Sequence, residues 1–277
     1  MRKKHINEIF PKKRVVITGG GSGLGRQLAL DFGKMGWRVA ICDLNEEAAH
    51  KTVDLINGAG GNGFFHICDV SKWDQMLDFS NLVKERFGGV DVVINNAGVI
   101  VAGFVEDVDV EDWNWILSIN LMGVVHGCKA FIPILKSQKK GYIVNIASSA
   151  GIVSLAEMAQ YNVTKAGVIS LLETLKMELS PFNIGISCVC PTFFKTNLMQ
   201  GARWGNERQR KLAQKMFDKS LATVEDVSRD IIKSIEKNKL YVITQWDGKI
   251  LWFFKRLSPL LFYKFMSVYY KKILNRL

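Results

Sequence analysis

The chain has 277 residues, 48% of them hydrophobic, and a net charge of +11. Residues 1–14 carry +5 and residues 249–277 carry +7, which leaves −1 for the segment between them. A nearly neutral body argues against a nucleic-acid-binding domain, whose basic stripe would lie on the folded surface. The first residues lack the apolar segment of a secretory signal, and no uncharged apolar run reaches the ~18 residues of a spanning helix.

The cysteines are scattered through apolar, strand-like runs and show no metal-ligand spacing. We therefore expect buried, small apolar side chains in a reducing compartment, no metal site and a cytoplasmic location. The residues concerned are Cys42, Cys68, Cys128, Cys188 and Cys190.

Strand-like runs alternate with helical stretches from residue 14 to about residue 245. The runs are continuously apolar, as in parallel strands covered on both faces. This alternation predicts an α/β fold with a doubly wound parallel sheet, a single domain at 13–247 and a basic aromatic extension at 248–277. The predicted strands are 14–18, 37–43, 63–68, 91–95, 142–147, 184–190 and 240–244, and the predicted helices 23–35, 45–57, 71–87, 111–136, 157–180 and 223–237.

A glycine-rich turn follows the first predicted strand, in the sequence Thr18-Gly-Gly-Gly-Ser-Gly-Leu-Gly25. Glycines between a strand and a helix let the backbone approach a pyrophosphate, which then lies on the positive helix N-terminus. The second strand ends in Asp43, whose carboxylate can bind an adenosine ribose and repels a 2′-phosphate. These features predict a dinucleotide site that favours NAD over NADP. The alternative for Asp43 is an ordinary loop residue or helix cap.

Tyr161 and Lys165 lie four residues apart in a predicted helix and so share one face. An ammonium beside a phenol favours the phenolate, so we expect the pKa of Tyr161 to fall from about 10 toward working pH. A tyrosine of this kind serves as a general acid or base.

The chain resembles the short-chain dehydrogenase/reductase family over roughly residues 13–245. The resemblance rests on seven motifs in the family's order: Thr18–Gly25, Asp69-Val70, Asn95-Asn96-Ala97-Gly98, Asn120, Ser148, Tyr161 with Lys165, and Pro191 to Thr196. It implies a Rossmann fold and hydride transfer between a nicotinamide cofactor and an alcohol or ketone.

The resemblance also implies individual roles. Tyr161 would exchange a proton with the substrate oxygen, Lys165 would lower its pKa, and Ser148 would donate a hydrogen bond to that oxygen. Asn120 would bend its helix around a water that links Lys165 to solvent. Thr196 would hold the carboxamide of the nicotinamide. The implied cofactor site comprises Gly19, Ser22, Gly23, Leu24, Gly25, Asp43, Asp69, Val70, Asn96, Ala97, Gly98, Tyr161, Lys165 and Thr196.

Two positions of the implied site are ambiguous or depart from the family's pattern. The family's serine lies thirteen residues before the tyrosine, which selects Ser148 over its neighbour Ser149. The family's Pro-Gly is Pro191-Thr192 here, followed by Phe193 and Phe194. Loss of that glycine removes conformational freedom, and we expect the two aromatic rings to line the nicotinamide end.

Residues 193–220 stand where the family places its variable substrate lid. Apolar residues on one side of this segment, together with nearby Leu155 and Met158, favour a hydrophobic substrate such as a lipid, steroid or retinoid. The alternative is a solvated amphipathic helix. The apolar lid residues are Leu198, Met199, Trp204, Leu212, Met216 and Phe217, with Arg203, Arg208, Arg210, Lys211 and Lys215 expected outside.

The extension holds eight aromatic residues and seven Lys/Arg with no acid between 249 and 277. We expect Pro259 to divide it into two amphipathic helices. Such helices suit a membrane interface, but the same apolar face could pack on the body or on a partner subunit. By resemblance, a homodimer or homotetramer would form through the helices at 111–136 and 157–180.

The sequence therefore predicts an NAD-dependent alcohol dehydrogenase or ketone reductase. The alternatives are a non-catalytic NAD(P)-binding sensor of the same fold and a sugar-nucleotide epimerase or dehydratase. The complete set of Ser148, Tyr161, Lys165 and Asn120 disfavours the sensor, because binding alone does not need all four.

Overall fold

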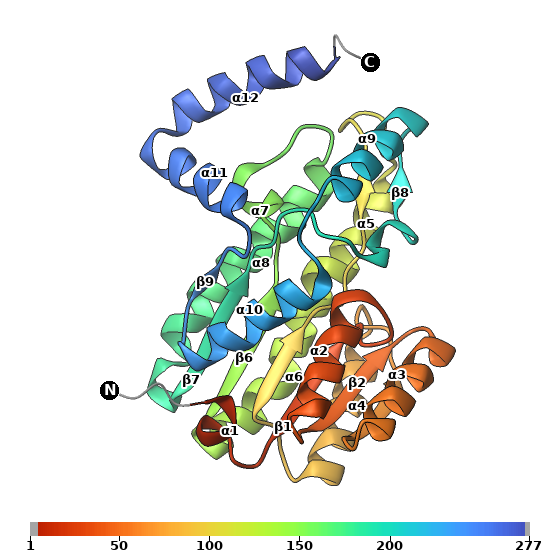
Figure 1. Ribbon diagram of the computed structural model, residues 1–277, viewed down its shortest axis with the longest axis vertical. Coiled ribbons are helices and arrows are strands. Elements are labelled where there is room, and N and C mark those ends of the chain that lie inside the picture. Colours follow the sequence, from red (N-terminus) through yellow and green to blue (C-terminus); the bar gives the residue numbers. More distant parts are fainter. Residues whose placement is uncertain (1–4, 275–277) are drawn as a thin grey trace.

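The structure is a computed structural model that describes residues 5–274 (Figure 1). Seven parallel strands form one sheet in the order β3-β2-β1-β4-β6-β7-β9. The predicted doubly wound parallel sheet in a single domain is confirmed. The strands are β1 (Arg14–Thr18), β2 (Arg38–Asp43), β3 (Asn62–Ile67), β4 (Val92–Asn95), β6 (Gly141–Ile146), β7 (Ile184–Val189) and β9 (Tyr241–Val242).

Helices cover both faces of this sheet. Successive strand residues point to opposite faces, so Val16 packs with one helical layer, and Val15 and Ile17 pack with the other. One layer consists of α4 (Trp73–Phe87), α6 (Gly123–Gln138) and α8 (Ala159–Glu178). The other consists of α1 (Ile6–Ile9), α2 (Gly23–Lys34), α3 (Glu46–Gly58) and α10 (Val224–Glu236). Burial on both sides explains why the strands read as continuous apolar runs.

The strand order reverses between β1 and β4, since β2 and β3 lie on one side of β1 and β6, β7 and β9 on the other. At such a switch point the loops after the two strands diverge and leave a crevice at their carboxyl ends, where open α/β sheets bind ligands. The glycine-rich turn follows β1, and residues 96–98 follow β4, so both predicted cofactor segments border this crevice.

The predicted helix 111–136 is interrupted. It consists of α5 (Val110–Leu117), a π-helical turn η1 (Ser118–Met122) and α6, which continue one another. Among the described residues, this stretch from Val110 to Gln138 is the one helix long and apolar enough to cross a membrane by length and composition. Val124 and Phe131 bury part of it against the sheet, as in the core helix of a globular domain.

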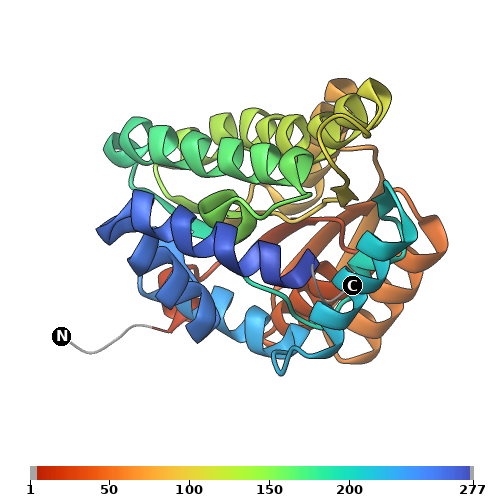
Figure 2. The same ribbon diagram turned by 90° about the horizontal axis from the view of Figure 1, so that it is seen from above.

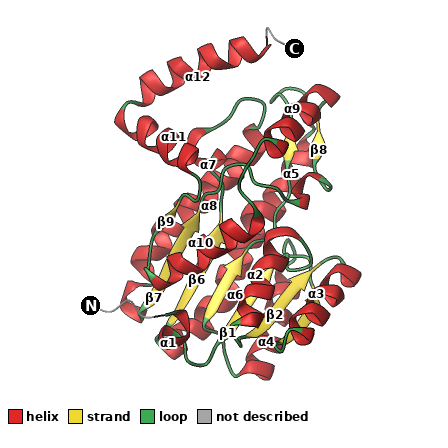
Figure 3. Cartoon of the chain, in the orientation of Figure 1, coloured by secondary structure: helices red, strands yellow, loops and turns green. Residues whose placement is uncertain are grey.

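The lid and the C-terminal extension lie above the carboxyl edge of the sheet (Figure 1). The lid contains η3 (Asn197–Met199), β8 (Arg203–Trp204) and α9 (Glu207–Asp218), and β8 pairs with β5 (Val101–Ala102). The extension forms α11 (Trp246–Leu257) and α12 (Pro259–Leu274), so the predicted division at Pro259 is confirmed. Short helices α7 (Ala150–Val153) and η2 (Ser180–Phe182) complete the chain, and Figure 3 shows how strands are confined to the lower part and the small β5–β8 pair.

All five cysteines are buried and unpaired, as expected from their apolar surroundings. The Sγ atoms of Cys188 and Cys190 lie 3.8 Å apart on one face of β7. These side chains fill the core beneath α8, the helix that carries Tyr161 and Lys165.

Candidate active site

The glycine-rich turn makes close backbone contacts that a larger residue would prevent. Gly19 has a φ of +64° and Gly23 a φ of +50°, a region that side chains with a Cβ rarely adopt. A Cβ on Gly19 would lie 2.9 Å from the Cα of Ala97, and one on Gly25 would lie 2.0 Å from the carbonyl oxygen of Gly19. The glycines therefore let the turn lie directly against the loop after β4.

Asn96 fixes the turn to that loop. Its Nδ2 donates to the carbonyl oxygens of Thr18, at 2.9 Å, and Gly19, at 3.1 Å. The Thr18 hydroxyl accepts from the backbone N–H groups of Asn96 and Ala97. The structure thus brings Asn96 and Ala97 to the predicted cofactor crevice, where the Asn96 side chain supports the turn.

The first turn of α2 faces the crevice with open backbone donors. Its N-cap residue, Ser22, is exposed and makes no capping hydrogen bond with its side chain. A helix N-terminus with unpaired N–H groups attracts anions such as a pyrophosphate. Leu24 turns its side chain into the core, so only its backbone remains available to a ligand. A cradle formed by glycine backbone at a helix N-terminus fits a dinucleotide.

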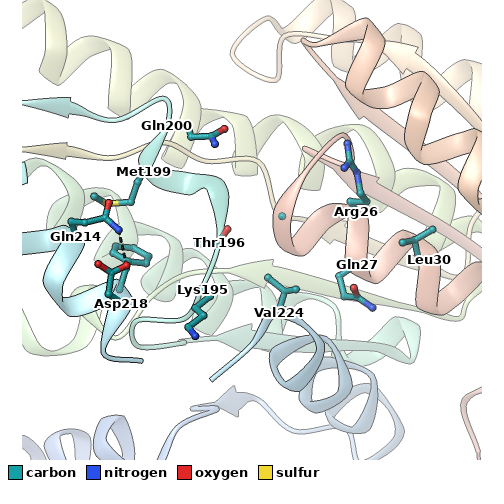
Figure 4. Close-up of a pocket in the computed structure, with 12 residues that line it drawn as sticks. Arg26, Gln27, Leu30, Lys195, Thr196, Met199, Gln200, Gln214, Asp218 and Val224 are labelled. Carbon is teal, nitrogen blue, oxygen red and sulfur yellow. Dashed lines mark hydrogen bonds between the residues drawn. The ribbon is translucent and has the colours of Figure 1, made fainter. Parts of the chain in front are cut away.

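Thr196 lies opposite this turn. A Cβ built on Gly23 would be 2.9 Å from the Thr196 hydroxyl, so the loop after β7 faces the predicted diphosphate site. Figure 4 shows Thr196 between the side chains of α2 and those of the lid, around a pocket of about 580 Å³. The pocket is lined by Arg26 and Gln27 from α2 and by Lys195, Gln200 and Gln214 from the lid segment, among others.

Asp43 joins the end of β2 to the glycine-rich turn. Its Oδ2 accepts from the N–H of Gly21 at 2.8 Å, and its Oδ1 accepts from the N–H of Asn45 at 3.0 Å. The side-chain cap of α3 is Asn45 instead, which accepts from Ala48. Asp43 is therefore not the helix cap considered as the alternative, and its carboxylate borders the crevice where a ribose would lie.

Asp69 and Val70 follow β3 at the same edge. Asp69 Oδ1 accepts from the N–H of Ser71 at 2.9 Å, which closes a local turn. The Val70 side chain is buried in the core, and its carbonyl oxygen accepts from Nδ1 of His126. Gly98 lies deeper, because a Cβ there would be 3.2 Å from Asn120 Oδ1 and 3.5 Å from Lys165 Nζ. The loop after β4 therefore runs from the cofactor turn to the catalytic residues.

Tyr161 and Lys165 lie one turn apart on α8, as predicted, and both are buried. Lys165 Nζ donates to the carbonyl oxygen of Ile146 at 2.9 Å and lies 5.6 Å from the centre of the Tyr161 ring. This hydrogen bond fixes the ammonium of Lys165 at the end of β6, which borders the crevice. The pair is held from two elements, a helix and a strand end.

The expected fall in the pKa of Tyr161 is wrong for this structure. Burial raises the pKa of the phenol to about 12, and the nearby Ser148 hydroxyl offsets only part of that rise. Burial also lowers the pKa of Lys165 to about 8, partly offset by Cys188 and Cys190. The prediction considered only the charge of the Lys165 ammonium. Burial also removes water from around the phenolate, and this desolvation disfavours the charged form.

Asn120 lies in the π-helical turn between α5 and α6 and is fully buried. Its Oδ1 accepts from the N–H of Val99 at 2.8 Å, and its Nδ2 donates to the carbonyl oxygen of Val99 at 2.9 Å. π-Helical turns mark functional sites more often than ordinary helix does. Both Asn120 and Lys165 lie next to Gly98. A water that links Lys165 to solvent beside Asn120 stays a prediction.

Ser148 is the serine that the structure places beside the tyrosine. Its hydroxyl counteracts the pKa shift of Tyr161, and its Oγ accepts from the N–H of Ala150 at 3.1 Å. Ser149 is the N-cap residue of α7, and its N–H donates to the carbonyl oxygen of Pro191. This arrangement supports the choice of Ser148, although both serines border the same cavity.

A cavity of about 350 Å³ extends from Ser148 and Tyr161 into the lid and the extension. Its walls are mainly aliphatic and aromatic side chains. The expected lining residues are present: Leu155, Met158, Phe193, Phe194, Leu198, Trp204, Leu212, Met216 and Phe217. Met199 lies at the pocket beside α2 instead. Thr192, which replaces the family's glycine, has no positive φ, so the loop does not depend on a glycine there.

Arg208 is not on the outside of the lid, contrary to expectation. It forms an ion pair with Glu157, whose side chain is only 6% exposed. Glu157 also accepts from Gln209 Nε2 at 2.7 Å and from the Tyr270 hydroxyl at 2.6 Å. The capping box at Asn206 turns α9 so that Arg208 and Gln209 face inward.

The sequence reasoning missed the part of the cavity that α12 supplies. Figure 2 shows α12 crossing the molecule from α11 toward the lid. Residues Tyr263, Met266, Ser267, Tyr269 and Tyr270 of α12 line the same cavity as Tyr161. Packing on the body, one of the two expectations for the extension, is therefore observed. The only signal in the sequence was the density of aromatic residues, which does not say where they pack.

Comparisons with known proteins agree with this site. Residues 13–207 match the sequence family described as short chain dehydrogenase. The putative oxidoreductase SadH of Mycobacterium tuberculosis is 30% identical over 244 residues, or 87% of this chain and 88% of that protein. Trans-4-hydroxycyclohexanecarboxylate dehydrogenase of Sinomonas cyclohexanicum is 34% identical over 207 residues, or 72% of this chain and 79% of that protein.

Solved structures give the same result. A short-chain dehydrogenase/reductase from Burkholderia phymatum, in complex with NAD, has a TM-score of 0.84 at 30% identity. The match covers 89% of this chain and 94% of that one. An NAD⁺-bound xylitol dehydrogenase has a TM-score of 0.75 at 25% identity, over 84% of this chain and 96% of that one. With its fold, its nucleotide crevice and its buried Tyr161–Lys165 pair, the chain belongs to the short-chain dehydrogenase/reductase family of oxidoreductases that use a nicotinamide cofactor.

Proposed function

We propose that this oxidoreductase transfers a hydride between NAD and a hydrophobic alcohol or ketone. The observation that carries the proposal is the shared cavity, because Ser148 and Tyr161 border a space whose other walls are mainly aliphatic and aromatic side chains. Apolar pockets with a few polar groups bind apolar ligands and fix their orientation. The hydroxyl of an alcohol would thus meet Ser148 and Tyr161, while its carbon skeleton lies against the apolar walls.

Ser148, Tyr161 and Lys165 have different roles in the proposed proton exchange with the substrate. Ser148 donates a hydrogen bond to the substrate oxygen, where negative charge develops. Tyr161 takes the hydroxyl proton during oxidation and returns it during reduction. Lys165, held by the Ile146 carbonyl, places a positive charge near the phenol and favours its ionised form during that exchange. The chemistry that the bound nicotinamide supplies is acceptance or delivery of the hydride.

NAD is proposed over NADP because of Asp43. Its carboxylate lies at the end of β2 with no ion-pair partner among the described residues. A fixed negative charge there repels a 2′-phosphate and accepts hydrogen bonds from ribose hydroxyls. The remaining predicted contacts, from Gly19, Ser22, Gly23, Leu24 and Gly25 to Thr196, would hold the diphosphate and nicotinamide.

A turnover screen tests this function. The full chain would be assayed with NAD and NADP against secondary alcohols of rising chain length, cyclic alcohols, steroids and retinoids, and against the ketones in reverse. We expect turnover with NAD that improves as the substrate becomes more apolar. Binding of NAD without turnover of any substrate would instead support the alternative, a non-catalytic sensor. A preference for small, charged hydroxy compounds would contradict the hydrophobic substrate.

A second proposal concerns the outer face of the extension, which we assign to an anionic membrane surface. Phe253 is 64% exposed, Leu257 73%, Leu260 87% and Phe265 55%. Lysine and arginine residues are interleaved with these side chains: Lys249, Arg256, Lys264, Lys271 and Lys272. Apolar side chains enter the headgroup boundary while cations attract acidic lipids, so charge favours a lipid surface over a purely apolar protein patch.

Vesicle sedimentation tests the membrane proposal. The wild type should sediment with vesicles that contain phosphatidylserine and much less with pure phosphatidylcholine, and salt should weaken the binding. Leu257→Glu should reduce sedimentation about tenfold. Leu221→Glu is the matched control, since Leu221 is 96% exposed but lies outside the extension. Equal loss in both variants, or binding that ignores lipid charge, would overturn the proposal.

The assembly and location are proposed from the family. We propose a homodimer or homotetramer, formed through the outer faces of 111–136 and 157–180, in the cytoplasm and in part on the membrane surface. Val163 and Met177 of α8 are exposed apolar residues on such a face. Light scattering after size-exclusion chromatography should give twice or four times the mass of the chain, and a monomer at micromolar concentration would contradict this.

A further inference from the structure

The side of helix α12 that contacts the rest of the molecule is centred on one stripe, flanked by Tyr263, Ser267 and Tyr269. Phe262, Met266 and Tyr270 recur every four residues and so share a face. Phe262 is fully buried and packs edge-to-face on Phe254 of α11, with ring centres 5.6 Å apart. The positions between them, such as Leu261, Phe265 and Val268, are exposed. The stripe therefore decides where α12 lies.

Two residues of that stripe border the substrate cavity. Met266 and Tyr270 line the same space as Ser148 and Tyr161, with Tyr263 beside them. Lys255, in the last turn of α11, donates a hydrogen bond to the Ile152 carbonyl and so ties the end of α11 to α7. The cavity wall is therefore partly built by a segment that follows the whole Rossmann domain.

One buried carboxylate connects this wall to the lid. Glu157 Oε1 accepts from the Tyr270 hydroxyl at 2.6 Å, while Oε2 accepts from Gln209 at 2.7 Å and pairs with Arg208. Every oxygen of Glu157 is thus engaged, so this residue does not bind substrate. It is a positioning residue that joins α12, α9 and the loop before α8. Hydrogen bonds to a buried charge are stronger than neutral ones.

We propose that Met266 and Tyr270 of α12 form the distal wall of the substrate site, and that Glu157 bonds this wall to the lid, so that α12 sets the length of hydrophobic substrate the enzyme accepts. This inference rests on the proposed hydride transfer to or from a hydrophobic alcohol or ketone. It assigns specificity to the extension, whereas the catalytic step stays with Ser148, Tyr161 and Lys165.

Substitutions that enlarge or shrink the side chain at position 266 test whether Met266 forms the distal wall of the cavity. The substrates are unbranched 2-alkanols from four to fourteen carbons, with NAD and the full chain. Met266→Trp should fill the far end of the cavity and lower kcat/KM for the long alcohols by at least tenfold, while the shortest stay within about twofold. Met266→Ala should move the optimum to longer chains. Each methylene that gains or loses burial changes affinity by about fourfold.

Two further variants separate the wall from general effects on folding. Val268→Trp introduces the same ring on the exposed face of α12 and should leave the chain-length profile unchanged. Tyr270→Phe keeps the ring but removes the bond to Glu157, and should raise KM for long alcohols about threefold to tenfold with little change in kcat.

The possible results distinguish a failure of the wall assignment from a failure of the proposed function. If the wild type turns over 2-alkanols but Met266→Trp and Met266→Ala change all chain lengths equally, the wall assignment is wrong and the proposed function stands. If the wild type turns over none of the 2-alkanols, the screen with cyclic alcohols, steroids and retinoids decides the proposed function, and calorimetric binding of 2-alkanones decides the wall. Weaker binding of 2-dodecanone to Met266→Trp but not to Val268→Trp supports it, and equal binding refutes it.

Discussion

The crevice at the switch point and the cavity beneath α12 differ in how they are built. In the crevice, each functional group follows the end of a strand, and neighbours in space come from short motifs such as the glycine-rich turn. In the cavity, the groups come from α8, the lid and the extension, more than a hundred residues apart in the case of Glu157 and Tyr270. The chemistry therefore depends on local sequence, while substrate choice depends on how distant segments pack.

The largest effect should come from Tyr161, where the cavity meets the crevice. Tyr161→Phe removes the hydroxyl that exchanges the substrate proton, and turnover should fall by about a thousandfold. The dissociation constant for NAD, measured by fluorescence titration, should change by less than about threefold. Ser149→Ala is the control and should retain most activity, whereas Ser148→Ala should not. Undiminished turnover in Tyr161→Phe would show that the catalytic assignment is wrong.

A smaller effect is expected at the ribose end of the crevice. Asp43→Asn removes the negative charge but keeps an oxygen that can accept from Gly21. The ratio of kcat/KM for NADP to that for NAD should rise about tenfold or more, because a unit charge near a phosphate no longer opposes binding. Asp54→Asn, an exposed change of the same charge on α3, should leave the ratio unaltered. A wild type that already prefers NADP would refute the role of Asp43.

The smallest effect concerns stability rather than rate. Burial lowers the pKa of Lys165 to about 8 in the folded protein, from the 10.5 that is ordinary for a lysine in water. Between these values the unfolded state binds more protons, so the wild type should gain stability relative to Lys165→Met as pH rises from about 8 to 10. The gain should be about 2 kcal/mol by urea unfolding. Lys51→Met, an exposed change on α3, should show no such trend.

If that trend has the opposite sign, Lys165 is stabilised as a cation in the fold. The crevice would then hold its ammonium by favourable charge rather than by burial against the Ile146 carbonyl. The measurement therefore tests directly whether desolvation dominates the electrostatics of the Tyr161–Lys165 pair.

The parallel sheet, the succession of its strands along the chain and the candidate catalytic residues could be predicted from the sequence for a physical reason. Parallel strands buried on both faces are continuous apolar runs, and glycines or polar residues at their ends mark the crevice. Strand β9 was expected at 240–244 but contains only Tyr241–Val242, because edge strands pair on one side alone and end early.

Other features could not be predicted in this way. The π-helical turn at Asn120 leaves no distinct hydrophobic pattern, since α5 and α6 continue as one apolar stretch. The rise in the pKa of Tyr161 depends on its burial in the folded protein, which spacing along one helix does not reveal. Arg208 was expected in solvent, and only the position of Glu157 explains why it turns inward.

The stripe that holds α12 has a thermodynamic consequence. A helix attached by few buried side chains opens locally at a low free-energy cost. Because Met266 and Tyr270 border the cavity, a molecule bound there would stabilise the closed helix by mass action. Amide hydrogens between 259 and 274 should then exchange more slowly when a long ketone is added, while those of β1 and β4 keep their rates. The exchange rates of α12 would therefore show whether the cavity is occupied.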